Sequence, residues 1–184
     1  MAVLVRLLVT VAAVSLAWTI PARAQSGETI EDEVKAAFLY NFTKYVDWPA
    51  AAFQDASDPL RMCVVARPKF VRAVENLISG ETSRGRPIQL VTPELTNLNR
   101  CHVLFTGASE ASRFDAALPA LSGRPILTVA ESKTLFDQGG AILLVVDNSR
   151  VRFDVNVRAI EKAGLTVSSK LLRVARNVHG EAVR

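Results

Sequence analysis

Apolar side chains recur at helical spacing through residues 33–49, EVKAAFLYNFTKYVDWP. At 100° per residue they gather on one arc, made of Val34, Ala37, Phe38, Phe42, Tyr45 and Trp48 with Leu39 and Val46 at its margins. Ala36 and Thr43 fall on the opposite side. The pattern predicts a core helix that begins at a capping box of Thr29 and Asp32 and ends before the proline that closes the stretch.

Asn41 falls inside this predicted apolar arc, between Val34 and Trp48 in angle. A buried amide needs hydrogen-bond partners, and leaving it without them costs about 1 to 3 kcal/mol. We therefore expect Asn41, Phe42, Tyr45 and Trp48 to shape one structural core helix.

Short apolar runs alternate with helical patterns through the rest of the chain. The expected strands are residues 60–66, 88–91, 101–105, 125–129, 141–146 and 151–155. The expected helices are residues 68–79, 110–121, 133–138, 157–163 and 170–178. The last two strands flank a turn at residues 147–150. This order predicts a single α/β domain with a mainly parallel sheet flanked by helices, ending in an antiparallel hairpin and a C-terminal helix.

The N-terminal residues 1–24 have the pattern of a secretory signal peptide. An apolar run covers residues 3–20, and Ala22-Arg23-Ala24 suits a cleavage site before Gln25. A membrane anchor is the alternative, although the run is short for a bilayer span. No later apolar run is long enough to cross a membrane. We expect an exported, periplasmic domain over residues 25–184 that is not embedded in the membrane after cleavage.

The charge of this mature chain is nearly balanced. Removing Arg6 and Arg23 from the 22 basic residues leaves 20 against 18 acidic ones, a net charge of +2. Balance and export both argue against nucleic acid as a partner. The balance is uneven, because residues 150–184 hold eight Lys and Arg against three acids. A solvent-exposed surface is the ordinary explanation of this basic excess, and a docking face for an acidic partner is the more specific one.

Basic residues also follow a helical pattern near the C-terminus. Lys170, Arg173, Arg176 and His179 are three residues apart and would share one face if the last helix continued. This face is either a solvent-exposed basic stripe or a site for an acidic partner surface, a carboxylate or a phosphate. We keep these four residues as candidate partner-binding or anion-binding positions.

Cys63 and Cys101 are the only cysteines, and both fall on expected strands. In an exported protein an intrachain disulfide is the expected outcome, with two buried thiols or a bridge between chains as alternatives. His102 is next to Cys101, but His179 is the only other histidine, and this spacing matches no zinc site. We expect no metal and no cofactor.

The turn at residues 106–109 joins an expected strand to an expected helix and could offer backbone amides to an anion, with a plain Ser109 cap as the alternative. The chain contains no G-x-S-x-G elbow, phosphate-binding loop or H-E-x-x-H motif. We expect a protein that is not an enzyme.

Several stretches together resemble the YfiR family of small periplasmic repressor proteins. They are VKAAFLYNFTKYVDWP, CHVLF, PILTV, GGAILLVVDNSRVRFDVN and AGLTVSSKLLRVAR, which span nearly the whole mature chain. The resemblance implies a secreted α/β domain, often dimeric, that binds the periplasmic part of an inner-membrane diguanylate cyclase and holds the cyclase inactive. It also implies lower cyclic di-GMP, less biofilm and a structural disulfide at Cys63 and Cys101. Relatives can carry a second cysteine pair, which this chain lacks.

Two functional hypotheses therefore remain. The first is a regulatory binding protein that represses a membrane cyclase by contact. The alternative is a periplasmic receptor for a small anionic ligand, with a pocket at the carboxyl edge of the parallel sheet near Gly107 or in the region from Arg173 to His179.

Overall fold

The computed structural model describes residues 23–114 and 116–180, so all but the last two residues of the predicted signal segment 1–24 lie outside it. Within the described part, no helix is long and apolar enough to cross a membrane.

An eight-stranded sheet forms the centre of the domain, in the order β10-β8-β7-β6-β5-β2-β4-β3. The strands are β2 (Leu60–Val65), β3 (Thr82–Ser83), β4 (Arg86–Val91), β5 (Val103–Thr106), β6 (Leu127–Ala130), β7 (Ile142–Asp147), β8 (Arg150–Asn156) and β10 (Asn177–His179). Strands β4, β2, β5, β6 and β7 run parallel, and β8 returns antiparallel to β7. The predicted α/β domain with a mainly parallel sheet and a late hairpin is confirmed.

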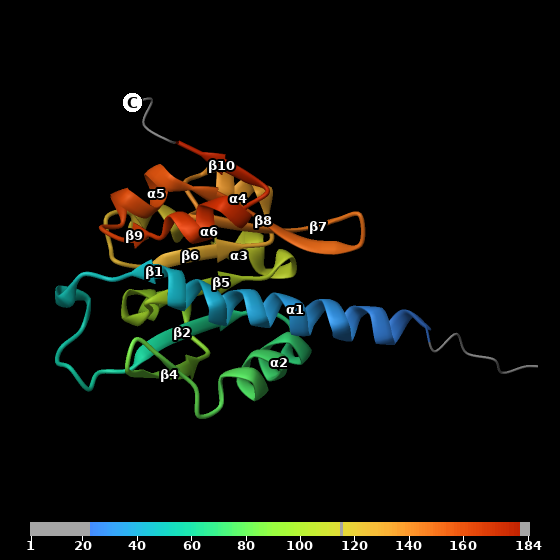
Figure 1. The fold of residues 1–184 in the computed structure, drawn as a ribbon, viewed down its shortest axis with the longest axis horizontal. Coiled ribbons are helices and arrows are strands. Elements are labelled where there is room, and N and C mark those ends of the chain that lie inside the picture. The colour runs from blue at the N-terminus through green and yellow to red at the C-terminus, as the bar shows by residue number, and fades with distance from the viewer. Residues whose placement is uncertain (1–22, 115, 181–184) are drawn as a thin grey trace, which may run out of the picture.

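Helices cover both faces of this sheet (Figure 1). On one face lie α1 (Arg23–Tyr45) and α2 (Pro68–Ile78), while α5 (Val157–Lys162) and α6 (Ser169–Val174) add Ile160 and Leu171 to the same core. The other face is covered by short elements, namely η2 (Leu95–Arg100), η3 (Ala108–Glu110), α3 (Ala111–Phe114), η4 (Leu118–Leu121) and α4 (Lys133–Asp137). The sheet thus separates two apolar clusters, the larger one beneath α1.

Helix α1 differs from its prediction at both ends. It begins at Arg23, so Thr29 and Asp32 lie inside the helix and the predicted capping box is wrong. It ends at Tyr45 because the chain then enters β1 (Val46–Asp47), which pairs with β9 (Thr166–Val167). Strand pairing, and not the later proline, ends the helix. One further short helix, η1 (Ala50–Ala52), follows the proline.

The buried face of α1 is also rotated from the predicted arc. Its buried residues follow a clean helical spacing, namely Asp32, Lys35, Ala36, Leu39, Phe42 and Thr43. Phe42 is buried as predicted, but Asn41 is exposed and donates from Nδ2 to the Ala37 carbonyl at 2.9 Å. Tyr45 is 37% exposed. Trp48 lies beyond the helix. The prediction assumed that only apolar residues face inward, whereas this helix buries an acid and a lysine.

Two other predicted helices are broken or shorter. Residues 110–121 form α3 and η4 as separate pieces, with Pro119 at the start of the second piece. The last helix ends at Val174 instead of continuing to residue 178. There the Arg176 amide donates to the Phe153 carbonyl at 2.8 Å, and β10 then pairs with β8. Pairing with the sheet replaces the last helical turn, so a parallel edge strand follows the C-terminal helix.

Candidate functional site

The two cysteines form an intrachain disulfide. Cys63 lies on β2 and Cys101 two residues before the start of β5, and both are buried. Strands β2 and β5 are neighbours near the centre of the sheet. The predicted pairing is confirmed, and the alternatives of buried thiols or an interchain bridge do not apply.

His102, the neighbour of Cys101, has a structural environment. Its Nδ1 accepts the Arg61 amide at 2.9 Å, and its Nε2 lies 3.0 Å from the Ala52 carbonyl, to which it donates. The ring stacks on Phe53, with 4.4 Å between the ring centroids. Burial lowers the pKa of His102, which keeps the imidazole neutral. Both ring nitrogens are engaged by backbone groups. Across residues 23–114 and 116–180 no three His, Cys, Asp or Glu side chains gather where they could hold a metal ion.

The turn after β5 is occupied by a side chain of the protein itself. The Ala108 amide donates to Glu131 Oε2 at 2.9 Å, and Glu131 Oε1 accepts from Lys35 Nζ at 2.6 Å. A Cβ atom at Gly107 would lie 3.1 Å from that of Ala66, so a side chain here would crowd the residue after β2. An external anion at this carboxyl edge of the sheet would have to displace Glu131. The turn therefore binds the domain's own carboxylate, and Ser109 does not cap it through its side chain.

The four basic residues near the C-terminus do not form one helical stripe. Lys170 and Arg173 are exposed on α6, whereas Arg176 lies beyond the helix and His179 on β10. The structure thus corrects the shared helical face, because the helix ends before Arg176 is reached.

Arg176 has a partner within the domain. Its Nε and Nη2 donate to the two carboxylate oxygens of Asp154 at 2.8 and 2.7 Å, and Asn177 donates to Asp154 at 3.1 Å. The hydrogen bonds from Arg176 hold the pKa of the Asp154 carboxyl below its ordinary value. Arg176 therefore fastens β10 to β8 and is not a free anion-binding group.

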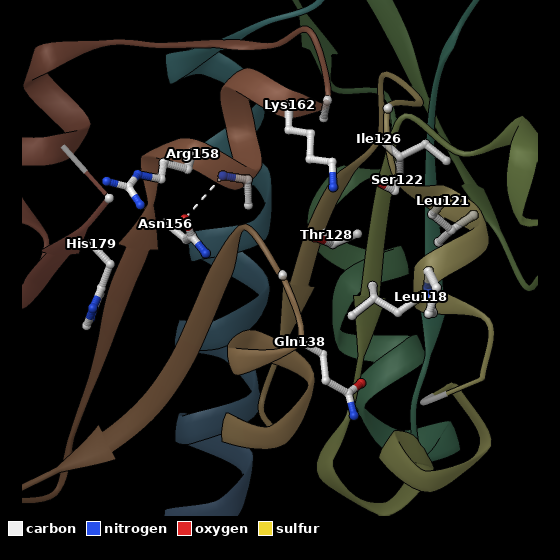
Figure 2. A pocket seen from close by; sticks show the side chains of 16 residues that line it. Leu118, Leu121, Ser122, Ile126, Thr128, Gln138, Asn156, Arg158, Lys162 and His179 are labelled. Carbon is white, nitrogen blue, oxygen red and sulfur yellow. Dashed lines mark hydrogen bonds between the residues drawn. The ribbon is translucent and has the colours of Figure 1, made fainter. Parts of the chain in front are cut away.

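A cleft of about 640 Å³ opens at the edge of the sheet where β6 begins and β8 ends. It lies between α5 and η4, opposite to the carboxyl edge at which the sequence placed a pocket. One wall carries the basic side chains of Arg158, Lys162 and His179, and the facing wall is apolar, with Leu118, Leu121 and Ile126. In Figure 2 Lys162 extends from α5 toward the space between these walls.

The local sequence explains how the basic wall is built. Asn156 ends β8 and caps α5, because its Oδ1 accepts the Ala159 amide at 3.1 Å (Figure 2). The helix then places Arg158 and Lys162 one turn apart on a shared side. The stem of Arg158 lies on Gly180, where a Cβ would approach its Cγ to 2.8 Å. Among the described residues that line the cleft none is acidic, so an anion with an apolar part fits its chemistry.

The cleft residues were only partly foreseen from the sequence. His179 was a candidate, and it does line the cleft, but Lys170, Arg173 and Arg176 do not. Arg158 and Lys162 were missed. Their spacing of four residues behind an asparagine cap was the available signal, but basic pairs on exposed helix faces are common.

The comparison with protein families is decisive for the assignment. A family model described as YfiR/HmsC-like matches residues 32–176. The chain belongs to the YfiR/HmsC-like family. This family consists of regulatory, periplasmic proteins. The match covers α1 from Asp32 and extends to Arg176, just before β10.

Two solved structures are similar to this chain at low sequence identity. A conserved domain protein from Vibrio cholerae O1 biovar El Tor has a TM-score of 0.50 and 11% identity, over 80% of this chain and 60% of that one. This likeness concerns the fold alone. The YfiR/HmsC-like chain spans about three fifths of the Vibrio cholerae protein. The ABC domain of a Streptococcus pneumoniae protein, solved in complex with L-Trp, has a TM-score of 0.43 and 11% identity, over 65% and 55% of the two chains.

Proposed function

We propose that this protein represses an inner-membrane diguanylate cyclase by contacting its periplasmic domain, which lowers cyclic di-GMP and biofilm formation. The observation that carries the proposal is the family match across residues 32–176. The signal pattern over residues 1–24 supports delivery to the compartment in which such a contact could form.

Repression by contact requires that the protein bind the inactive state of the cyclase more tightly than the active one. Each tenfold preference between the two states corresponds to about 1.4 kcal/mol of binding free energy. A rigid binding surface favours such discrimination, since less conformational entropy is lost on association. The disulfide between two central strands and the buried core beneath α1 provide that rigidity.

Crosslinking in intact cells tests this proposal. The exported protein should be recovered covalently attached to a membrane diguanylate cyclase, and deletion of its gene should raise cyclic di-GMP while that cyclase is expressed. A variant lacking residues 1–24 is the control, because it should remain in the cytoplasm and give neither the adduct nor repression. Unchanged cyclic di-GMP after deletion, with the cyclase present, would contradict the proposal.

The basic and apolar walls of the cleft support a second candidate function, reception of a small anionic ligand. We expect an aromatic or aliphatic carboxylate to raise the melting temperature of the mature protein in a concentration-dependent manner. At a ligand concentration of one hundred times Kd the stabilisation is about 2.7 kcal/mol. The probes are a panel of such carboxylates, with inorganic phosphate as the anion that lacks an apolar part.

A double substitution, Arg158→Ala with Lys162→Ala, should abolish this shift because it removes two cations of the wall. Lys170→Ala is the matched control, since Lys170 is exposed on α6 outside the cleft. Equal shifts in the wild type and the double variant would exclude the cleft as the binding site.

A further inference from the structure

Strand β8 is paired on both sides along only part of its length. Strand β10 pairs with Asp154, Val155 and Asn156, whereas Arg150 to Arg152 have β7 on one side only. In the part of the chain that the structure describes, no strand pairs with them on the other side. In Figure 1 the tip of the β7–β8 hairpin extends beyond the neighbouring strands of the sheet. The first half of β8 is therefore an open edge of the sheet.

The hydrogen-bonding direction of each β8 residue follows from two contacts. The Asn156 amide donates to the Ala141 carbonyl beside β7, while the Phe153 carbonyl accepts the Arg176 amide on the opposite side. Since the direction alternates along an antiparallel strand, Val151 turns its amide and carbonyl outward, as Phe153 does. Val151 thus offers a donor and an acceptor that an added strand could use.

A groove of about 330 Å³ runs beside this open edge. Phe38 of α1, Val151, Phe153 and Val174 of α6 provide its apolar lining. Val174 is 64% exposed although it is a large aliphatic side chain. A strand edge beside an apolar groove is the arrangement that proteins use to bind extended peptides, with backbone bonds for affinity and the groove for side chains.

The charges around the groove indicate the chemistry of the occupant. Arg150 and Arg152 line it, Arg173 is exposed on the adjacent α6, and none of the three has an ion pair among the described residues. Pairing of this edge with a second copy of itself would bring two sets of arginines together, which is unfavourable. An acidic segment would be complementary instead.

We propose that the open edge of β8 binds an extended, acidic segment of the cyclase's periplasmic domain by strand addition. The inference rests on the proposed repressor function and names the surface that performs it. Val151 supplies the outward backbone bonds, the groove takes alternate side chains, and Arg150 and Arg152 select for acids.

Val151→Pro tests the backbone contact, because proline removes the outward amide while the ladder to β7 uses the neighbouring residues. Affinity for the purified periplasmic domain of the crosslinked cyclase should fall about tenfold or more, equivalent to at least 1.4 kcal/mol. Val151→Thr is the matched control. It keeps the amide and the branched shape, and its affinity should stay within about twofold of the wild type.

A charge-reversed variant, Arg150→Glu with Arg152→Glu, provides a second test that leaves the backbone unchanged. Binding should again weaken about tenfold, and its dependence on salt should become shallower. Arg124→Glu is the control, because Arg124 is exposed and lies outside the groove. Circular dichroism confirms that each variant is folded before its affinity is measured.

The outcomes separate this inference from the proposed function. If the wild type binds the cyclase and the Val151→Pro and charge-reversed variants bind equally well, the edge assignment is wrong while repression by contact stands. If the wild type binds no cyclase, the edge assignment and repression by contact are both wrong. If the two variants turn a wild-type dimer into monomers without changing cyclase binding, the occupant is a second copy and the proposal is overturned.

Discussion

Mature protein in which Cys63 and Cys101 are both replaced by alanine should lose about 4 kcal/mol of unfolding free energy. The crosslink closes a loop with a sequence separation of 38 residues. In the chain-entropy description, removing it raises the conformational entropy of the unfolded chain and so favours unfolding. For a domain of this size about 4 kcal/mol is a large share of the total stability. Urea unfolding of the oxidised wild type and the variant, monitored by circular dichroism, measures the difference.

Wild-type protein treated with a reductant is the control for this comparison. Reduction removes the crosslink but keeps both sulfur atoms in the core, so it should reproduce most of the loss if chain entropy is its cause. A double-alanine variant within about 1 kcal/mol of the oxidised wild type would show that the disulfide adds little. Because β2 and β5 are central strands, we also expect the unfolding transition to remain a single cooperative one.

The sheet was predictable from the sequence because its strands are buried on both faces. Runs such as residues 60–66 and 141–146 are almost continuously apolar, as expected for a sheet covered by helices on both sides. The turn at residues 147–150 also acts locally, and the structure confirms it. In these strands and in the hairpin turn, the local sequence and the burial pattern indicate the same structure.

The buried side of α1 was not predictable by the same rule. A hydrophobic arc assigns Lys35 and Asp32 to solvent, yet both are buried because charged partners come from elsewhere in the chain. Arg67 donates to Asp32 at 2.8 Å, and Glu131 accepts from Lys35 at 2.6 Å. These partners are 35 and 96 residues away in sequence, so no pattern within the helix reveals them.

The cleft and the edge strand depended on tertiary contacts in the same way. The cleft is assembled from four stretches that are separate in sequence, namely residues 118–128, 138–139, 156–163 and 179–180. The sequence of β10 has no strong β pattern of its own. Pairing with β8 and the ion pair between Arg176 and Asp154 stabilise this strand. Sequence reasoning extended the preceding helix because residues 170–178 suit a helix equally well.

Lys35 is the residue of α1 on which this buried charge cluster depends. Its side chain is 8% exposed and forms ion pairs with Glu31 and Glu131. Burial alone would lower the pKa of Lys35, but the hydrogen bonds that Lys35 donates to Glu131 and Glu31 outweigh it and raise that pKa. Burial raises the pKa of the neighbouring Asp32. Lys35 thus provides positive charge within a group of three carboxylates.

Replacing Lys35 with methionine should therefore cost about 3 kcal/mol of unfolding free energy near neutral pH. Methionine keeps much of the apolar stem but leaves Glu131 and Glu31 without their shared cation. Lys133→Met is the matched control, because Lys133 also pairs with an acid four residues away, Asp137, but is 76% exposed. It should change stability by no more than about 0.5 kcal/mol.

The pH dependence distinguishes lost charge compensation from lost packing in the Lys35→Met variant. The raised pKa of Lys35 means that the folded wild type holds the ammonium proton more tightly than the unfolded chain does. This contribution is complete below the ordinary pKa of a lysine side chain and is lost as the pH rises through the raised value, so the deficit of the variant should be full at neutral pH and shrink at alkaline pH. Urea unfolding at about pH 7 and about pH 11 measures this change. A deficit that stays constant between the two would assign the loss to packing, and a Lys35→Met variant as stable as Lys133→Met would show that the buried lysine is dispensable.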